Sequence, residues 1–360
     1  MTMATLNPPA EQGMPQAAGL SVWPLISVVT PVYNAAGTIV RTLQSAIRQT
    51  YPHKEIILVI DGSPDDSLAR IRAYLDSAPT PPGCTVMVIE QANQGSGAAR
   101  NAGMKAAHGE FIALLDSDDI WADDKLMLDY RTWQTRSDPQ TFIYSSYYAV
   151  DDDFSLVKIH PITRDEGHIV ASVISRESLV LPSTSFFPKS LLSTMGDFPL
   201  NCPGREDWMF FIRMALQFPG CATGHRSTLY RQSLSGQGRC AVSNYEAALE
   251  KNWRMDDALA SLMTPEIYTI FETRRKNNTL FTFLMYNYTD FAKRYYQENR
   301  AHFTLRELAG TTKGRLALLS LYTGINLLFA SRLIYQVATR SILAPWWKAK
   351  MNRSFGAMTV

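Results

Sequence analysis

The chain has 360 residues, of which 46% are hydrophobic and 19% charged, and its 35 Lys and Arg nearly balance 33 Asp and Glu. This composition excludes a chain that is disordered throughout, and the length is ample for one large domain with appendages or for two domains. The four cysteines, Cys84, Cys202, Cys221 and Cys240, form no C-x-x-C pair, which argues against a disulfide framework and a cysteine zinc site. A reducing cytosol suits this cysteine usage best.

The N-terminal segment is almost uncharged. Glu11 is the single charged side chain in the first 40 residues, among Pro, Ala, Gly, Gln and Met. No cationic segment precedes an apolar stretch, so a secretory signal peptide is not expected. We expect residues 1–21 to form a flexible leader.

Short apolar runs alternate with segments of helical periodicity between about residues 25 and 150. The pattern predicts strands at residues 26–29, 55–60, 85–89 and 111–115, with helices at residues 39–47, 66–75 and 97–107 between them. Apolar strands joined by crossover helices indicate a mostly parallel sheet that is covered on both faces. Ligands bind beyond the carboxyl ends of such strands, so we expect the four following loops to converge on one site.

The first of three acidic clusters is Asp61-Gly62-Ser63-Pro64-Asp65-Asp66, which directly follows a predicted strand. Gly62 and Pro64 favour a turn, and Asp65 can cap the next helix, which is a purely structural role. Asp61 lies at the carboxyl end of the strand, where its carboxylate can accept an N–H group from a base such as uracil, thymine or guanine.

The second cluster, Asp116-Ser117-Asp118-Asp119, also comes straight after a predicted strand. Alternate carboxylates at a strand end can share a divalent cation that also binds phosphate oxygens. A surface turn before a helix cap has the same composition, so both interpretations stay open. Sequence alone does not choose between them.

The third cluster, Glu206-Asp207, opens an apolar helix predicted at residues 206–217. Acidic residues in a first helical turn commonly just complement the helix dipole. A carboxylate held there can instead act as a general base. Both interpretations are kept.

The segment 93–101 is rich in glycine and leads into a predicted helix, so it can cradle phosphates. Its spacing matches neither the dinucleotide-binding G-x-G-x-x-G pattern nor the P-loop. The chain also lacks an H-E-x-x-H motif and a G-x-S-x-G elbow. These observations disfavour a nicotinamide enzyme, a P-loop NTPase, a zincin and an α/β-hydrolase.

Five segments in order resemble the motifs of the family 2 inverting glycosyltransferases of the GT-A fold, over about residues 26–231. They are Thr30-Pro31-Val32-Tyr33-Asn34, Asp61-Gly62-Ser63, residues 95–103 with Arg100-Asn101, Leu115-Asp116-Ser117-Asp118-Asp119, and Glu206-Asp207-Trp208 ahead of Arg213. The resemblance implies an α/β fold with a mostly parallel central sheet flanked by helices. It places a nucleotide-sugar half at residues 22–150 and an acceptor half at 151–240. The helical pattern after residue 242 and the basic C-terminus predict a helical, basic extension at 241–360.

The resemblance also implies roles for individual residues. It assigns donor binding to Thr30, Pro31, Tyr33, Asp61, Arg100 and Asp116. Among these, Thr30, Tyr33 and Asp61 would hold the nucleotide base, Arg100 would lie near the nucleotide and Asp116 would approach the ribose.

The remaining implied roles concern a divalent metal and the acceptor. By the resemblance, Asp118 would ligate Mn²⁺ or Mg²⁺ on the diphosphate, helped by Asp119. Asp207 would be the general base for the acceptor hydroxyl, with Glu206 beside it in the catalytic motif. The metal would offset the charge on the departing nucleoside diphosphate, and one in-line displacement would invert the anomeric configuration.

Two departures from the family pattern matter. Many relatives carry two acids before the Gly-Ser turn, whereas here Ile60 precedes Asp61, so Asp61 alone would read the base. The Gln-x-x-Arg-Trp pattern of processive polymer synthases is absent, which points to the addition of a single sugar.

The leading hypothesis is a glycosyltransferase that moves one sugar from a nucleotide-sugar donor, foremost a UDP-sugar, to a hydroxyl of a saccharide or lipid-linked glycan acceptor. One alternative is a polyprenyl-phosphate sugar transferase, whose ionised acceptor would not need Asp207 as a base. Others are a non-catalytic scaffold subunit of a membrane glycan-synthesis complex and a nucleotidyltransferase, which would release pyrophosphate. No nucleic-acid partner is expected.

The C-terminal segment, residues 308–360, carries seven Lys and Arg and no Asp or Glu. Such a segment suggests contact with an anionic membrane surface, although a solvated basic tail has the same composition. Residues 316–331 are uncharged and would span about 24 Å as a helix, which is short of a hydrocarbon core of roughly 30 Å. A helix buried in protein or lying at the membrane interface fits better, and Trp346 and Trp347 beside two lysines resemble an interfacial anchor. We therefore expect a cytoplasmic protein, peripheral at the inner face of the cell membrane.

Overall fold

The computed structural model describes residues 23–175, 179–200, 206–232, 261–272, 280, 284 and 289–298. The expected leader at residues 1–21 and the basic segment 308–360 lie outside the described residues, as do Cys202 and Cys240. Both cysteines within the described ranges, Cys84 and Cys221, are free. None of the helices in those ranges is long and apolar enough to cross a membrane.

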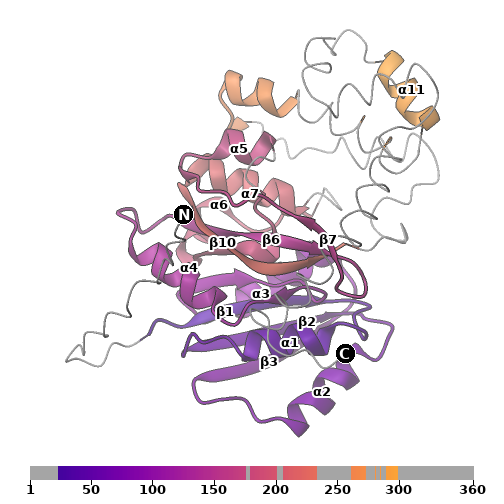
Figure 1. Cartoon of the computed structure of the whole chain (residues 1–360), viewed down its shortest axis with the longest axis vertical. Helices are drawn as coiled ribbons and strands as arrows, with labels where there is room; N and C mark the ends of the chain where they lie inside the picture. The colour runs from indigo at the N-terminus through magenta and orange to yellow at the C-terminus, as the bar shows by residue number, and fades with distance from the viewer. Residues whose placement is uncertain are drawn as a thin grey trace, which may run out of the picture.

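One twisted sheet organises the described chain (Figure 1). Its strands are β1 (Ile26–Val32), β2 (Lys54–Asp61), β3 (Cys84–Gln91), β4 (Phe111–Leu114), β5 (Ile120–Trp121), β6 (Phe142–Val150), β7 (Leu156–Ile159), β8 (Glu166–Gly167), β9 (Ser185–Pro188) and β10 (Gly220–Arg231). The order in the sheet is β3-β2-β1-β4-β9-β6-β10-β5, with β7 paired to β6 and β8 to β10. The sheet therefore runs without a break across the predicted boundary near residue 150, and the division into two halves there stays a prediction.

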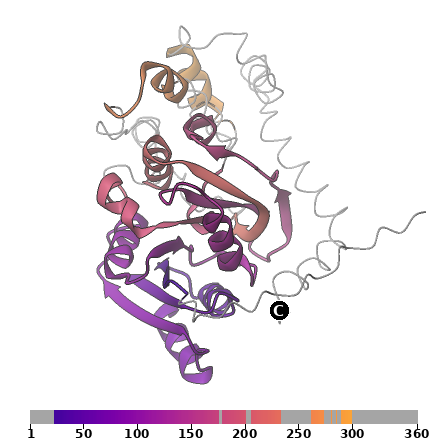
Figure 2. The ribbon, with the colours of Figure 1, turned by 90° about the vertical axis from the view of Figure 1, so that its left-hand side faces the viewer.

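Helices cover both faces of this sheet, as the side view shows (Figure 2). They are α1 (Ile39–Ile47), α2 (Ser67–Ser77), α3 (Ser96–Ala106), α4 (Lys125–Gln134), α5 (Val170–Ser175), α6 (Leu192–Met195), α7 (Glu206–Gln217) and α11 (Thr289–Glu298), with short 3₁₀ turns η1 (Pro182–Thr184) and η2 (Lys189–Leu191). Neighbouring strand residues such as Val28 and Val29 point to opposite faces, so each face has its own core. One core includes residues of α3, α5 and α7, and the other includes residues of α1, α2 and α4.

The strands and helices predicted between residues 26 and 115, and the helix predicted at 206–217, are present, and their bounds agree with the structure to within three residues. The helix predicted at residues 316–331 lies outside the described residues. Strands β3, β2, β1 and β4 are parallel throughout, as the apolar runs predicted. The sheet is mixed beyond β4, because β9 runs antiparallel to both β4 and β6, while β6 and β10 are parallel. The four-residue β9 is too short to show periodicity, and the pattern after residue 151 did not reveal it.

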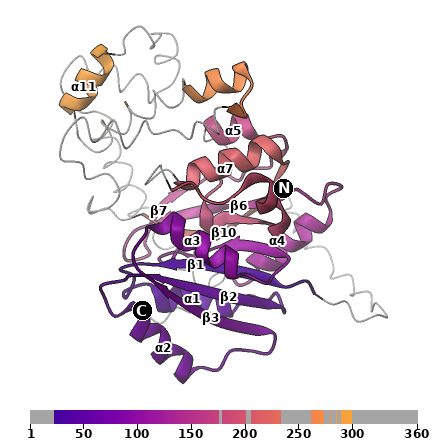
Figure 3. The same cartoon turned by 180° about the vertical axis from the view of Figure 1, so that it is seen from behind.

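Helix α3 lies close against β1 and β2, which brings its N-terminus towards the carboxyl ends of these strands (Figure 3). Gly103 makes this approach possible, because a Cβ atom there would be 2.4 Å from Val29 Cγ1 and 3.2 Å from Val59 Cγ2. β-branched side chains on the strands have little rotamer freedom with which to move aside. The contact therefore requires glycine.

A second feature braces the loops at the same edge of the sheet. The Asp65 carboxylate accepts hydrogen bonds from the hydroxyls of Ser63 and Ser67, both at 2.6 Å, from the Ser67 backbone N–H at 3.2 Å and from the Ala36 N–H at 2.8 Å. Partial burial alone would raise the pKa of Asp65, but these four hydrogen bonds outweigh it and lower the pKa to about 2. The N-cap residue of α2 is Asp66 rather than Asp65. Asp65 precedes it and ties the loop after β1 to the loop after β2.

We expect Gly103→Ala to lower the free energy of unfolding by about 1–2 kcal/mol, because overpacking outweighs the gain in helix propensity. Gly37→Ala is the matched control, since a Cβ atom there meets nothing within 4 Å. Urea unfolding followed by circular dichroism measures both variants. Equal stability of the two variants would contradict the close contact of α3 with β1.

We expect Asp65→Asn to destabilise the fold at pH 6, because an amide is a weaker and less complete acceptor for these four donors. The pKa of Asp65 is lower in the folded chain than its usual 3.8, so the stabilisation is complete above about pH 4 and is lost as the pH falls towards 2. Melting temperatures of the variant and the wild type should therefore converge as the pH falls from about 4 towards 2. Asp66→Asn is the control, because the Asp66 carboxylate makes an exposed pair with Arg70 at 3.7 Å. A difference in melting temperature between Asp65→Asn and the wild type that stays constant with pH would contradict the lowered pKa of Asp65.

Candidate functional site

A pocket of about 380 Å³ lies beyond the carboxyl ends of β1, β2, β3 and β4. Its lining comes from the loops after these four strands, from the start of α3 and from the end of β10. The lining residues are Pro31, Val32, Tyr33, Asn34, Ala35, Thr38, Asp61, Asn93, Gly95, Ser96, Arg100, Asp116, Ser117, Asp118 and Arg231. The predicted convergence of the four loops is confirmed.

Asp61 holds the glycine-rich loop in place at the edge of this pocket. Its buried carboxylate accepts hydrogen bonds from Gln91 Nε2 at 2.8 Å, from the Gln94 N–H at 2.9 Å and from the Gly95 N–H at 2.8 Å. A carboxylate has about four acceptor positions, so these three bonds leave room for one more donor. Contact with a nucleotide base stays a prediction for Asp61.

The three residues predicted from the first motif lie at different depths. Pro31 and Tyr33 line the pocket, and Tyr33 is 52% exposed. Thr30 is a buried residue of β1 outside the lining set, and its Oγ1 has no hydrogen-bond partner among the described residues. A role in holding the base stays a prediction for all three.

Arg100 and Asp116 form a buried ion pair in the pocket wall. Arg100 Nη2 donates to Asp116 Oδ1 at 2.5 Å, and the guanidinium lies 5.3 Å from the centre of the Phe198 ring. Burial acts to lower the pKa of Arg100, but Asp116, and less strongly Asp207 and Glu206, outweigh it and raise the pKa. Within the described part of the chain, Nε and Nη1 of Arg100 have no hydrogen-bond partner. The pocket wall therefore contains a fixed cation with two buried donor atoms that have no hydrogen-bond partner among the described residues.

The neighbouring carboxylates Asp118 and Asp119 have different environments. The Asp118 side chain is 33% exposed and lines the pocket, with Oδ2 3.7 Å from Arg231 Nε. Asp119 is fully buried outside the lining set, and its Oδ1 accepts a 2.8 Å hydrogen bond from the Arg231 backbone N–H. Burial, reinforced by Asp118 and Asp116, raises the pKa of Asp119 well above its usual range. Asp118 faces the pocket, whereas Asp119 secures the end of β10; metal binding stays a prediction for both.

No group of three or more His, Cys, Asp or Glu side chains that could hold a metal ion occurs in the described ranges. A cation that is bound mainly through substrate phosphates needs only one or two protein carboxylates. The geometry of Asp118 is suitable for that smaller contribution.

Glu206 and Asp207 begin α7 beside the pocket rather than in its lining. Glu206 Oε1 accepts a 2.6 Å hydrogen bond from Ser96 Oγ, and Ser96 is itself a lining residue. Asp207 Oδ1 accepts a 2.7 Å bond from the Trp208 N–H in the first turn of the helix. Both acids contribute to the raised pKa of Arg100, which places them in its electrostatic neighbourhood. Their catalytic roles stay predictions.

Sequence reasoning assigned no role to Arg231, which the structure places in the pocket lining. Its Nη1 donates to Asp152 Oδ1 at 2.9 Å. The residue belongs to no recognised motif. The only available signal was a cation directly after the apolar pair Leu229 and Tyr230, at the end of what proved to be β10.

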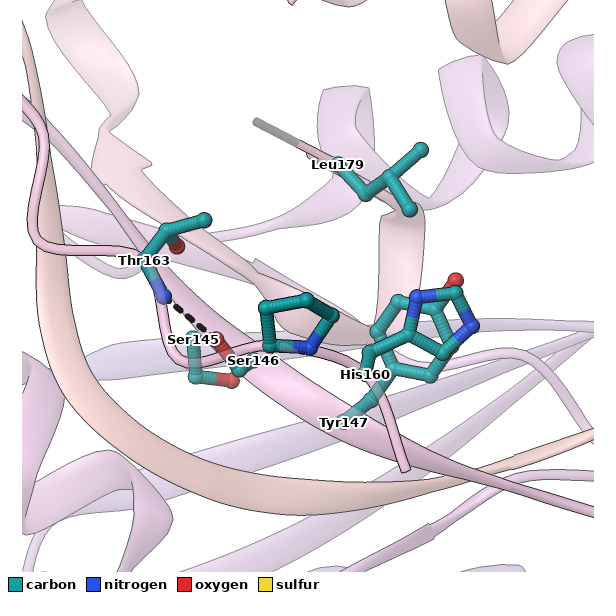
Figure 4. A pocket seen from close by; sticks show the side chains of 7 residues that line it. Ser145, Ser146, Tyr147, His160, Thr163 and Leu179 are labelled. Atoms are coloured by element: carbon teal, nitrogen blue, oxygen red, sulfur yellow. Dashed lines mark hydrogen bonds between the residues drawn. The ribbon is translucent and has the colours of Figure 1, made fainter. Parts of the chain in front are cut away.

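A second cavity lies against β6 and measures about 20 Å³ (Figure 4). It is lined by Ser145, Ser146, Tyr147, His160, Pro161, Thr163 and Leu179. The His160 ring stacks on Tyr147 with 4.0 Å between centroids, and burial, helped by Lys158 and Arg226, lowers the pKa of His160 to about 3. This volume suits one water molecule and is far too small for a nucleotide. The larger pocket is therefore the candidate functional site.

Comparison with known proteins identifies a family for this part of the chain. Residues 27–160 match the family profile described as Glycosyl transferase family 2. The chain is 34% identical over 135 residues to "UDP-Glc:alpha-D-GlcNAc-diphosphoundecaprenol beta-1,3-glucosyltransferase WfaP" of Escherichia coli, which covers 38% of this chain and 50% of that protein. An uncharacterized glycosyltransferase from Nostoc sp. is 42% identical over 110 residues, covering 31% of this chain and 33% of the relative. The chain thus matches only a third to a half of these relatives' length.

Solved structures show the fold. A crystal structure of S. aureus TarS 1–349 in complex with UDP-GlcNAc has a TM-score of 0.52 at 18% identity, covering 86% of this chain and 92% of that chain. Another structure of TarS 1–349 has a TM-score of 0.50 at 19% identity, with 83% and 92% coverage. The shared architecture is that of GT-A glycosyltransferases. Residues 27–160 of this chain thus match glycosyl transferase family 2, within a GT-A-like fold.

Proposed function

We propose that this chain is an inverting glycosyltransferase that moves one sugar from a UDP-sugar to a hydroxyl of a saccharide or lipid-linked glycan acceptor. The observation that carries the proposal is the pocket in which Asp61, Asp116 and Asp118 meet the buried cation Arg100. Its volume of about 380 Å³ is in the range of ligand pockets. Its position beyond the carboxyl ends of parallel strands is the usual one for nucleotides in α/β folds.

The donor would be bound by groups that match its parts. The exposed ring of Tyr33 offers an aromatic face to a base at the pocket mouth. The remaining acceptor capacity of Asp61 suits a base N–H, and the two free donor atoms of Arg100 suit ribose or phosphate oxygens. Two relatives support a UDP-sugar and a lipid-linked acceptor. WfaP is one, and the other is WfgD of Escherichia coli, which is 31% identical to this chain over 129 residues. Both are named as using UDP-Glc and a diphosphoundecaprenol-linked sugar.

A divalent metal fits the charge of the pocket. Three carboxylates against two guanidinium groups make the lining acidic before an anionic diphosphate enters. We propose that Asp118 holds Mn²⁺ or Mg²⁺, because it is exposed to the pocket, whereas Asp119 already accepts a bond from the Arg231 backbone. When bound, the metal would offset charge on the departing nucleoside diphosphate.

Asp207 is the proposed general base. It would take the proton of the acceptor hydroxyl while that oxygen forms a bond to the anomeric carbon of the donor. The bond from this carbon to the diphosphate oxygen breaks at the same time, its electron pair leaves with the nucleoside diphosphate, and the configuration inverts. In each acid one oxygen accepts a hydrogen bond, Glu206 from Ser96 and Asp207 from the Trp208 N–H, so the choice of Asp207 rests on its place in the family motif.

The alternative acceptor, a polyprenyl phosphate, is already ionised and would not need this base. The anionic membrane surface predicted for residues 308–360 also stays a prediction, because that segment lies outside the described residues.

We expect calorimetry to detect binding of UDP in the presence of Mn²⁺, and Asp118→Ala to weaken it at least about tenfold by removing a metal ligand. GDP and dTDP are titrated in parallel to identify the base. Asp123→Ala is the control, because the Asp123 side chain lies outside the pocket lining and makes an exposed pair with Arg48 at 3.3 Å. Binding that is equally tight in EDTA would contradict the metal proposal, and no binding of any nucleotide would contradict the donor proposal.

We expect Asp207→Asn to lower kcat by about 10²- to 10⁴-fold with little change in the KM for the donor, because only the proton transfer is lost. Initial rates with a lipid-linked saccharide acceptor measure this, and NMR of the product reports the anomeric configuration. Full activity of the variant would favour a phosphate acceptor instead. A product with retained configuration would refute single displacement.

A further inference from the structure

Arg231 is a cation at the donor pocket whose backbone and side chain are held separately. Its N–H donates to the buried Asp119 carboxylate at 2.8 Å, and its Nη1 donates to Asp152 Oδ1 at 2.9 Å. Its Nε lies 3.7 Å from Asp118 Oδ2, beyond hydrogen-bond distance, and has no hydrogen-bond partner in the described part of the chain. Arg231 therefore lines the pocket with a guanidinium whose buried Nε has no hydrogen-bond partner among the described residues.

The register of the sheet places Asp152 beside Arg231. Strands β6 and β10 are parallel, and Arg231 pairs with Val150 at the end of the ladder. The next residue, Gln232, donates its N–H to the Val150 carbonyl at 2.7 Å. Asp152 follows Val150 by two residues, so the pairing of the two strands delivers the carboxylate to the guanidinium.

The turn that carries Asp152 is itself well fixed. Asp151 Oδ1 accepts the N–H groups of Asp153 at 3.0 Å and Ser155 at 2.9 Å. Phe154 adopts a positive φ of 57° and packs its buried ring into an apolar cluster with residues of β5, β6 and β10. A carboxylate on such a turn can hold a flexible side chain in one orientation.

Two carboxylates thus compete for one guanidinium. Asp152 makes the hydrogen bond, whereas Asp118, the proposed metal ligand, forms a looser ion pair at 3.7 Å. Without Asp152, Coulomb attraction would draw Arg231 towards Asp118. There the guanidinium would compete with a metal ion for the same carboxylate.

We propose that Arg231 binds the diphosphate of the nucleotide-sugar donor and that Asp152 is the positioning residue that aims it there and keeps it from Asp118. This inference rests on the proposed function. It gives the turn between β6 and β7 a part in donor binding, although Asp152 itself does not line the pocket.

The test compares binding of UDP and UMP by calorimetry at fixed Mn²⁺, since only the diphosphate reaches the proposed contact. If the wild type prefers GDP or dTDP, that nucleotide and its monophosphate are used. Arg231→Gln should weaken UDP binding about tenfold or more and leave UMP binding nearly unchanged. Asp152→Asn should weaken UDP binding about threefold to fivefold, the size that a partly exposed ion pair supports, and raise the Mn²⁺ concentration for half-maximal binding.

Asp153→Asn is the matched control, because it removes the same charge from the same turn without touching the contact with Arg231. Removing a carboxylate near an anionic ligand favours binding by charge alone, so this control should bind UDP as well as the wild type or slightly better. In the Arg231→Gln background, Asp152→Asn should have no weakening effect. Melting temperatures check that each variant is folded, and Arg231→Lys provides a second variant that keeps the positive charge.

Two results would overturn this inference and leave the proposed function standing. One is equal UDP affinity of Asp152→Asn and Asp153→Asn. The other is an equal loss of UDP affinity from Asp152→Asn in the wild type and in the Arg231→Gln background. Parallel loss of UDP and UMP binding would also overturn it, because that pattern indicates a general structural effect. No nucleotide binding by the wild type would overturn the proposed function together with this inference.

Discussion

Arg100 and Asp116 form a buried ion pair, with 2.5 Å between Nη2 and Oδ1, that joins α3 to the loop after β4. Removing one partner of such a pair leaves a buried charge uncompensated, at a typical cost of about 3–5 kcal/mol. Gly103 lets the same helix approach β1 closely. The same helix presents Ser96 to Glu206 and so ties the start of α7 to the pocket. Packing of one helix on the sheet therefore connects the donor side of the site to its acidic motif.

The carboxylates around the pocket have two roles: some accept hydrogen bonds that hold the loops, and one faces the pocket. Asp65 and Asp61 accept hydrogen bonds from the loops that surround the pocket, and Asp119 accepts one from the end of β10. Asp118 instead faces the pocket with a partly exposed side chain. The pocket lining contains three carboxylates and two guanidinium groups, so it has an excess of negative charge. This excess accounts for the proposed need for a metal when a diphosphate binds. Structure and chemistry thus depend on the same type of side chain.

Much of this site could be anticipated from local pattern. Alternating apolar runs predicted the parallel strands, and the polar residues at their carboxyl ends predicted that the loops with Asp61 and Asp116 would converge. The family resemblance added Arg100 to this site. These predictions succeeded because each depends on a few consecutive residues. The mixed half of the sheet was not anticipated, since β9 has only four residues and its partners β4 and β6 are distant in the chain.

The sequence by itself determined the α/β class, the edge of the sheet that bears the site and the residue types available there, because strand periodicity and turn chemistry are local. Only the tertiary structure decided which of the two adjacent carboxylates, Asp118 or Asp119, faces the pocket, because neighbouring side chains in a loop can point in opposite directions. It also decided that Arg231 belongs to the site and that Asp152 holds it. These two residues are 79 positions apart, and the parallel register of β6 and β10, which no short motif encodes, brings them within 2.9 Å.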